Sequence, residues 1–387
     1  MGLFQGGNSH GACYMNVVLS GTGIYIPPDF ITTDELVTTY NTYATNYNQK
    51  FKKEISSGLH KTMEKSCADF VIKASGIYKR HVIDRAGILN PDILHPILPH
   101  RGDDELSIQC EMAVYAAKEA LKNANKTPQN IDAVIVACSN TQRPYPSIAM
   151  EVQATLGCKG FACDLNVACS SASFGINIAQ SLILSHAAKC VLMVNPEIYT
   201  GHLNFRDRTS HFIFGDACSA AILEDQRSCS AEHPYNIISG KLETKFSNNI
   251  RNNFGFLNRC EQNHAEVEDK LFVQQGRMVR QDVVPFTIDH VNHHLATCSI
   301  KSNKLKRLWL HQANIQMNND IARGIFGRKA SQFELPIILD EYGNTGASGV
   351  MIAFHKFHND LNKGDIGLLC SFGAGYGVGS ILLEKWG

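Results

Sequence analysis

An α/β fold made of two similar halves is predicted by three features of the sequence. Short apolar runs of strand length alternate with segments whose apolar residues recur at helical spacing, a pattern typical of buried strands covered by helices. The pattern also repeats within the chain, because Asp164–Cys169 followed by Gly175–Ala179 resembles Leu339–Asn344 followed by Gly349–Ala353. Finally, 387 residues suffice to bury a large core without disulfides or metals.

The expected strands are short and apolar and are bounded by polar or glycine-containing turns. In chain order they are Val17–Ser20, Ala133–Cys138, Ala162–Val167, Cys190–Asn195, Ser219–Glu224, Asn236–Ser239, Leu308–Leu310, Leu335–Leu339, Ile366–Cys370 and Ser380–Glu384. The expected helices keep apolar residues three and four positions apart. In chain order they are Ile108–Ala124, Pro146–Leu156, Ser171–Ser185, Val283–Ala296, Gln316–Phe326 and Ala347–Leu361.

The order of these elements is the same in both parts of the chain. We therefore divide it into an N-terminal half, residues 1–230, and a C-terminal half, residues 231–387. Each half is expected to contribute a mixed sheet, and the loops after equivalent strands are expected to meet at one site. Those loops carry Cys169, His311 and Asn344.

The composition excludes several classes of protein. The 36 Lys and Arg residues balance 36 Asp and Glu residues, so bulk charge gives no reason to expect a nucleic acid or an anionic membrane as the main partner. The 13 cysteines are scattered and form no CxxC pair, which favours free thiols in a reducing compartment. We find no signal-peptide pattern and no apolar run of membrane-spanning length. We therefore expect a soluble, cytoplasmic protein.

Cys169 is the strongest candidate for a nucleophile. It lies in the run Asn166-Val-Ala-Cys-Ser-Ser171, directly after an expected strand and at the start of an expected helix. The positive end of a helix dipole favours a thiolate, so we expect the pKa of Cys169 to be lowered. The alternative is an inert buried cysteine, which is our expectation for most of the other cysteines.

His311 follows the apolar run Leu308–Leu310, and Asn344 lies in Tyr342-Gly-Asn-Thr-Gly346, the counterpart of the cysteine loop in the second half. Taken alone, such a histidine is more often a core residue and such an asparagine a turn residue. Together with a cysteine they suit thioester exchange, followed by stabilisation of an enolate through hydrogen bonds from His and Asn. A protease-type set, in which the His takes the thiol proton and water attacks last, is the competing interpretation.

Six segments share their residues with one enzyme family, in the same order and at compatible spacing. They are Gly76-Ile-Tyr-Lys-Arg80, Asp164-Leu-Asn-Val-Ala-Cys169, Phe214-Gly-Asp-Ala-Cys-Ser-Ala-Ala-Ile-Leu223, His311-Gln-Ala-Asn314, Gly343-Asn-Thr-Gly-Ala-Ser348 and Phe372-Gly-Ala-Gly-Tyr-Gly-Val-Gly-Ser380. Over nearly its whole length the chain thus resembles the 3-oxoacyl-ACP synthase III (beta-ketoacyl-ACP synthase III) family of the thiolase superfamily. The resemblance implies a thiolase-like αβαβα five-layer fold and a homodimer.

The resemblance also implies a decarboxylative condensation. An acyl group from acyl-CoA, held on Cys169, is joined to malonyl-ACP to give 3-oxoacyl-ACP in fatty-acid initiation or a related pathway. His311 and Asn344 serve the decarboxylation, and the main-chain N–H groups of Cys169 and Ala374 form the oxyanion hole. No metal and no permanently bound cofactor is implied, because CoA and ACP (acyl carrier protein) thioesters are substrates. The alternative is an acyltransferase on the same fold that passes the acyl group to a hydroxyl or amine in secondary metabolism.

Several positions that the resemblance assigns to CoA depart from the family pattern. Phe70 stands where the family often has a Trp that stacks on adenine, whereas Arg208 matches a CoA-contacting Arg. Arg277 follows Gly276, where the family presents an Asn to the pantetheine arm. These departures leave the acyl donor's chain length open.

Further positions are assigned to macromolecular contacts. Gln316 stands where the family usually has an Arg facing the carrier protein. Arg323, Arg328 and Lys329 are the expected substitutes in that positive patch, and the alternative is that they form a solvated helix end. Tyr145 matches a family Phe that reaches across the dimer and closes the partner's acyl pocket. Tyr145→Ala is therefore expected to lengthen the acyl chain that the enzyme accepts.

Two segments, residues 38–68 and 86–105, are insertions relative to compact family members. The first is a Tyr/Asn/Thr-rich stretch followed by an expected Lys/Glu-containing helix, and the second is a loop rich in Pro, Leu and Ile. Both flank the segment expected to line the CoA entrance, so we expect them to shape its mouth. Deleting either one is expected to change donor preference more than stability, unless the insertions only extend the dimer surface.

Overall fold

The computed structural model describes residues 16–261 and 270–386, and a mixed sheet forms the centre of this described part. Its strands lie in the order β11-β12-β13-β8-β1-β7-β6-β4-β5. The first part of the chain supplies β1 (Val17–Tyr25), β4 (Ala133–Ala137), β5 (Phe161–Leu165), β6 (Cys190–Glu197) and β7 (Ala217–Asp225). The second part supplies β8 (Tyr235–Ser247), β11 (Leu305–Leu310), β12 (Ile366–Gly373) and β13 (Gly375–Lys385).

Each group of strands combines parallel and antiparallel pairs. In the first group β4 is parallel to β5 and β6, whereas β7 is antiparallel to β6 and β1. In the second group β11 is parallel to β12, whereas β13 is antiparallel to β12 and β8. The groups join where β8 pairs with β1, at Val18 opposite Asn236 and Leu19 opposite Tyr235.

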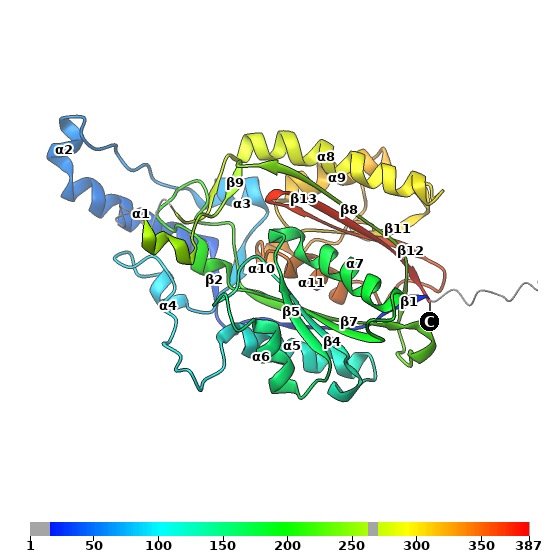
Figure 1. Ribbon diagram of the computed structural model, residues 1–387. Coiled ribbons are helices and arrows are strands. Elements are labelled where there is room, and N and C mark those ends of the chain that lie inside the picture. Colours follow the sequence, from blue (N-terminus) through cyan, green and yellow to red (C-terminus); the bar gives the residue numbers. More distant parts are fainter. Residues whose placement is uncertain (1–15, 262–269, 387) are drawn as a thin grey trace, which may run out of the picture.

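Helices form three layers around these strands (Figure 1). The outer face of the first group is covered by α5 (Ile108–Asn123) and α6 (Ile148–Leu156). The outer face of the second group is covered by α8 (Gly276–Thr297) and α9 (Ile315–Phe326). Between the two groups lie α7 (Ser171–Leu184) and α11 (Ser348–Lys356). Separate apolar cores fill the spaces between the layers. The predicted αβαβα arrangement is thus confirmed.

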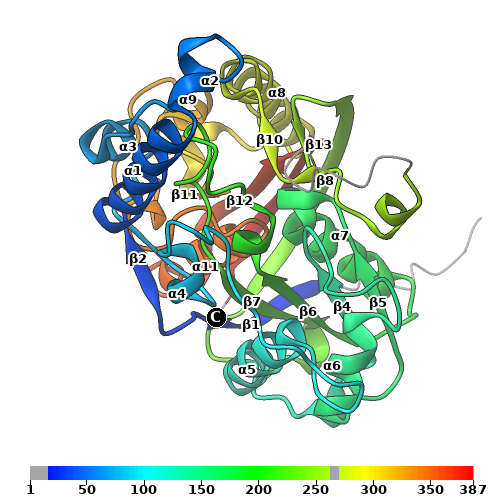
Figure 2. The ribbon, with the colours of Figure 1, turned by 90° about the vertical axis from the view of Figure 1, so that its left-hand side faces the viewer.

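A group of small elements lies at one end of the molecule, where α1 projects from the body (Figures 1 and 2). These elements are β2 (Phe30–Thr32), α1 (Thr33–Lys50), α2 (Lys52–Ser56), α3 (Ala68–Ser75), β3 (Lys79–His81) and α4 (Arg85–Ile88). The near end of α1 buries Leu36 in an apolar cluster with Phe205 and Phe214, and the buried Tyr40 stacks on the ring of His211. Among the helices of residues 16–261 and 270–386, none is both long and apolar enough to cross a membrane.

The first insertion is helical in a different part from the one predicted. Its Tyr/Asn/Thr-rich stretch forms the end of α1, whereas most of its Lys/Glu-containing part, after α2, is irregular. A capping box starts α1, because Thr32 and Glu35 bond each other's main-chain N–H groups. The buried Tyr40 and Ala44 then anchor the helix. The second insertion is a loop beyond α4, as predicted.

Two other predicted elements differ from the structure. Leu335–Leu339 is not a strand: Pro336 cannot donate a ladder hydrogen bond, and Leu335 and Ile338 are instead buried as irregular chain before α10 (Leu339–Tyr342). The helix expected over Ala347–Leu361 ends as α11 at Lys356. The other expected strands and helices are present, although several are longer than predicted: α8 begins at Gly276 instead of Val283, and β8 ends at Ser247 instead of Ser239.

Candidate active site

Cys169, His311 and Asn344 line one pocket of about 230 Å³ between the two groups of strands. Cys169 comes from a short 3-10 turn, Ala168–Ser170, between β5 and α7. The other two residues follow β11 and α10. The structure therefore brings together the three side chains that the repeat of elements predicted to meet. Apolar side chains make up much of the remaining lining: Ile77, Phe212, Ile213, Phe214, Ile250, Phe272, Val279, Val283, Met317 and Phe372.

The turn that carries Cys169 is held close to the hairpin joining β12 and β13. Ala168 has a φ of 46°, a left-handed conformation that bends the chain sharply before the cysteine. A Cβ atom added at Gly373 would lie 2.7 Å from the Cβ of Cys169, so only glycine permits this approach. The main-chain N–H groups of Cys169 and Ala374 both act on the thiol and lower its pKa. Two N–H donors thus converge on the sulfur.

The net pKa shift of Cys169 is opposite to the predicted one. Burial raises the pKa of its thiol to about 11, and this effect exceeds the lowering by Tyr199 and by the two main-chain N–H groups. The sequence argument counted the helix terminus but not the apolar surroundings, which are contributed by distant segments. The resting cysteine is therefore a neutral thiol at pH 7, and it needs a proton acceptor when it attacks.

His311 is buried at the end of β11. Its main-chain N–H donates to the Cys370 carbonyl at 2.8 Å, and its ring meets the edge of Phe372 with 5.3 Å between centroids. Burial lowers the pKa of His311 to about 4. The imidazole is consequently neutral at physiological pH, so it is a hydrogen-bond donor rather than a charged acid or an effective base.

Asn344 is fixed by its own loop. Its main-chain N–H donates to the Ile213 carbonyl at 3.0 Å, and its carbonyl accepts from Gly215 at 3.0 Å. The side-chain Oδ1 accepts from the Gly346 N–H at 3.0 Å. Because that oxygen is engaged within the loop, the Nδ2 amide is the end that can donate into the pocket.

Of the other predicted substrate contacts, Gly276 and Gln316 lie on the pocket lining. Arg277 lies beside Gly276 on an adjoining shallow pocket. Phe70 is exposed on α3 and does not belong to the pocket lining. Arg208 is paired with Glu64 of the first insertion at 2.6 Å.

Arg323, predicted to face the carrier protein, is exposed on α9 and lies 3.9 Å from Asp320. Asp320 also pairs with Arg280 at 2.5 Å. Arg280 lines both the main pocket and the adjoining one. Sequence reasoning missed Arg280 because the expected helix began only at Val283, whereas α8 begins at Gly276 and carries Arg280 one turn after it.

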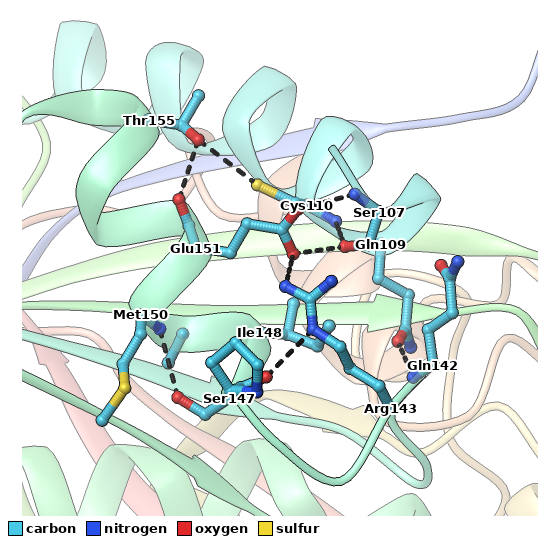
Figure 3. A network of polar contacts seen from close by, with 12 residues as sticks. Ser107, Gln109, Cys110, Gln142, Arg143, Ser147, Ile148, Met150, Glu151 and Thr155 are labelled. Atoms are coloured by element: carbon cyan, nitrogen blue, oxygen red, sulfur yellow. Dashed lines mark hydrogen bonds and ion pairs between the residues drawn. The ribbon is translucent and has the colours of Figure 1, made fainter. Parts of the chain in front are cut away.

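Tyr145 is 82% exposed and lies in the chain between Arg143 and Ser147. Figure 3 shows that the side chains of Arg143 and Ser147 both form hydrogen bonds that hold this loop. Arg143 donates to Glu151 of α6 at 2.8 Å and to the Pro146 carbonyl at 3.1 Å. Glu151 in turn accepts from Ser107 at 2.6 and 2.7 Å. A large aromatic side chain is therefore presented outward from a rigid support.

Comparison with known proteins gives a consistent result. The sequence model for 3-oxoacyl-[acyl-carrier-protein] synthase III matches residues 163–245, and the model for its C-terminal part matches residues 295–385. The chain is 52% identical over 346 residues to beta-ketodecanoyl-[acyl-carrier-protein] synthase of Pseudomonas aeruginosa, covering 89% of this chain and 99% of the relative. It is 30% identical to beta-ketoacyl-[acyl-carrier-protein] synthase III of Aquifex aeolicus, covering 70% of this chain and 83% of the relative.

Solved structures show the same fold. The crystal structure of the Aquifex aeolicus synthase III has a TM-score of 0.73 at 22% identity, covering 96% of this chain and 99% of that one. The synthase III from Pseudomonas aeruginosa has a TM-score of 0.73 at 21% identity, covering 96% and 98%. Given the sequence matches and the Cys-His-Asn pocket, this chain belongs to the 3-oxoacyl-ACP synthase III family of condensing acyltransferases.

Proposed function

We propose that the enzyme condenses an acyl group, taken from acyl-CoA and held on Cys169, with malonyl-ACP to give 3-oxoacyl-ACP and carbon dioxide. The observation that carries the proposal is the pocket in which a thiol, a neutral imidazole and an amide from three separate loops meet. Membership of the family supports the same reaction. CoA and ACP thioesters are the substrates, and the residues described supply every group that the two steps below require.

In the first step the Cys169 sulfur attacks the thioester carbonyl carbon, and CoA leaves. The carbonyl oxygen gains negative charge as the tetrahedral intermediate forms. The N–H groups of Cys169 and Ala374 converge on the sulfur, so we assign them as the oxyanion hole. The acyl group is then held as a thioester on the enzyme.

In the second step malonyl-ACP takes the place of CoA. His311 and the Nδ2 amide of Asn344 donate hydrogen bonds to its thioester carbonyl. These bonds stabilise the enolate that forms when carbon dioxide leaves, and the enolate carbon attacks the acyl thioester on Cys169. A neutral imidazole suits this task because it donates a hydrogen bond without requiring a counter-charge.

The acyl donor that we propose is an eight-carbon acyl-CoA. The relative with 52% identity is a beta-ketodecanoyl synthase, and a ten-carbon 3-oxo product corresponds to an eight-carbon donor lengthened by two carbons. The largely apolar lining of the pocket suits a medium-length alkyl chain. Transfer to a hydroxyl or amine, the alternative, has no use for an enolate-stabilising amide, so the Asn344 geometry favours condensation.

For substrate delivery we assign Gly276, Arg277 and Arg280 to the pantetheine and phosphate groups, because they line the mouth of the pocket and the shallow pocket beside it. Phe70 and Arg208 are assigned to the outer part of CoA. Gln316 and Arg323, both exposed on α9, are assigned to the carrier protein. A cytoplasmic homodimer is part of this proposal.

The proposal is tested by incubating the enzyme with malonyl-ACP and one acyl-CoA from a series of two to ten carbons, followed by mass analysis of the carrier-bound product. The expected result is a 3-oxoacyl-ACP whose yield is highest with the eight-carbon donor. Highest yield with the two-carbon donor would contradict the medium-chain assignment. Absence of any 3-oxo product, with acyl transfer to another acceptor instead, would favour the alternative.

Tyr145→Ala is expected to shift the donor preference toward longer chains by about two carbons or more, because removing the ring opens the end of the partner's acyl pocket. The preference is measured as relative kcat/KM over the same donor series. Met150→Ala is a matched control, since it removes another exposed apolar side chain nearby without affecting the tyrosine. An unchanged chain-length profile in Tyr145→Ala would contradict the assignment.

The role of the first insertion is best tested at its tip. Removing all of residues 38–68 would take Tyr40 and Ala44 from the core and would destabilise the protein. Replacing residues 52–62 by a short Gly/Ser linker avoids this loss. We expect KM for acyl-CoA to change severalfold, with a shift in thermal midpoint of under about 3 °C. An unchanged KM and donor preference would limit this segment to a structural role.

A further inference from the structure

A line of buried polar groups runs from the Cys169 thiol into the protein, away from the pocket. The Cys169 Sγ lies 3.2 Å from the hydroxyl of Tyr199. That hydroxyl forms a short hydrogen bond with the hydroxyl of Ser139. Ser139 Oγ lies 3.0 Å from Oε1 of Glu197, a carboxyl group that is fully buried. Two side chains, Tyr199 and Ser139, thus connect the nucleophile to one internal acid.

The hydrogen bonds in this line all point in one direction when Glu197 is ionised. A carboxylate oxygen only accepts, so the Ser139 hydroxyl donates its proton to Glu197. The Ser139 oxygen is then free to accept from Tyr199, and the Tyr199 oxygen is free to accept from the Cys169 thiol. Each donor is therefore aligned for proton movement from sulfur to carboxylate.

The surrounding structure holds Tyr199 in this position. Its ring stacks on Phe214 with 4.4 Å between centroids. On the other side Gly346 has a φ of 58°, and a Cβ atom there would lie 2.0 Å from the tyrosine ring. The same loop that carries Asn344 is thus shaped around the ring, which places the phenol oxygen at the sulfur.

Glu197 accepts its hydrogen bonds through one of its two oxygens. Its Oε1 accepts from the main-chain N–H groups of Ser139 and Ala347, both at 3.1 Å, as well as from the Ser139 hydroxyl. Its Oε2 is buried and has no hydrogen-bond partner among the described residues. A bare oxygen on a buried carboxylate costs free energy, and protonation lowers this cost because it removes the charge.

We propose that Tyr199 and Ser139 carry the thiol proton of Cys169 to Glu197 during acyl transfer. This inference rests on the proposed reaction with acyl-CoA. As the sulfur bonds to the thioester carbon, its proton moves to Tyr199, the tyrosine proton moves to Ser139, and the serine proton moves to Glu197. The carbon–sulfur bond to CoA breaks, and the CoA thiolate takes a proton from water.

The second half-reaction returns the stored proton. When the new carbon–carbon bond forms, Cys169 leaves as a thiolate, and Glu197 protonates it along the same line in reverse. One proton from water is consumed per turnover, which matches the carboxylate lost as carbon dioxide. His311 is not needed as a base, consistent with its neutral, weakly basic state.

The titratable groups that interact with Glu197 include Cys138, Cys169, Tyr199, Asp216 and Cys218. The hydrogen bonds from Ala347 and Ser139 lower the pKa of Glu197, but burial has the larger effect. Burial, with a smaller contribution from Asp216, raises the pKa of Glu197 to about 8. Because the line accepts a proton only when Glu197 is ionised, the acylation rate is expected to rise with pH and to level off above about pH 8.

The test is the pH profile of acylation by octanoyl-CoA, measured by rapid quench and intact-protein mass. Tyr199→Phe, Ser139→Ala and Glu197→Gln are each expected to slow acylation about tenfold or more near pH 7.5. In these three variants the acylation rate is expected to show no plateau above about pH 8. It should instead keep rising with pH until the Cys169 thiol itself ionises. Ser173→Ala, which removes a buried hydroxyl bonded to Ser371 instead, is the matched control. Profiles parallel to the wild type would overturn the proposal.

A second assay separates proton transfer from packing and needs no acyl substrate. Iodoacetamide alkylates the thiolate, and modification of the Cys169 peptide is followed by mass spectrometry. Glu197→Gln is expected to alkylate at least as fast as wild type, because it removes a negative charge that disfavours the thiolate, and yet to acylate more slowly. Equal slowing of both reactions would show a structural role and overturn the proposal.

The alkylation assay also separates this inference from the proposed function. Tyr199→Phe is expected to lower the alkylation rate severalfold, since the hydroxyl that stabilises the thiolate is lost. If no acyl thioester acylates the wild type, the proposed function fails, whereas this effect still reports on the line of hydrogen bonds. If the wild type is acylated, and Tyr199→Phe has the same acylation and alkylation rates as the wild type, the inference alone fails.

Discussion

Cys169→Ala is expected to abolish acyl transfer from acyl-CoA to the enzyme, with a loss of overall condensation of roughly 1,000-fold or more. The sulfur is the nucleophile of the proposed first step, and alanine supplies no atom that can hold the acyl group. Intact-protein mass spectrometry after incubation with octanoyl-CoA measures the result directly: the mass gain of the wild type should be missing in the variant.

The matched control for this prediction is Cys163→Ala, which removes an exposed thiol on β5, six residues before the nucleophile. It should acquire the acyl group as the wild type does. The Cys169→Ala variant should also retain slow decarboxylation of malonyl-ACP, because His311 and Asn344 remain in place. A Cys169→Ala enzyme that still gains one acyl group would move the nucleophile elsewhere.

Asn344→Ala and His311→Ala are each expected to slow condensation by roughly 100- to 1,000-fold while leaving acylation of Cys169 nearly unchanged. Each substitution removes one hydrogen-bond donor to the enolate, which exists only in the second half-reaction. Single-turnover measurements on enzyme acylated beforehand isolate that step. Acylation of the same variant serves as its internal control for folding.

The protease-type interpretation predicts a different result for these variants. If His311 took the thiol proton, His311→Ala would slow acylation as strongly as condensation. The pH dependence discriminates further. The pKa of His311 lies at about 4, so its neutral form persists throughout the range from pH 5 to 8. Condensation by pre-acylated enzyme should therefore show no loss centred near pH 6.5, where an unperturbed histidine gains its proton.

The meeting of Cys169, His311 and Asn344 in one pocket was predictable because Cys169 and Asn344 lie at equivalent places in a repeated pattern and His311 directly follows an apolar strand. That pattern is local in sequence, and the repeat supplied the long-range information that a single motif lacks. The same reasoning missed Tyr199 and Glu197, since Glu197-Ile-Tyr199 reads simply as the end of a strand. Nothing in the sequence pairs Ser139 with either residue, because the three meet only after β4 and β6 have paired.

Properties that depend on burial were the least predictable. The pKa of Cys169 was assigned the wrong direction because the helix terminus is visible in the sequence, whereas the apolar walls come from distant segments. The helix α1 was missed for a different reason. Its Asn, Thr and Tyr residues are poor helix formers, but the Thr32–Glu35 capping box was a readable start signal.

The hairpin between β12 and β13 determines when the enzyme first becomes reactive during its synthesis. A ribosome releases the chain from its N-terminus, so the turn bearing Cys169 emerges long before Gly373 and Ala374. Until then the sulfur lacks the main-chain N–H of Ala374, which the proposed first step requires. An incomplete nascent chain therefore cannot carry out the reaction. Reactivity is therefore expected to begin only after the hairpin between β12 and β13 has docked beside the Cys169 turn.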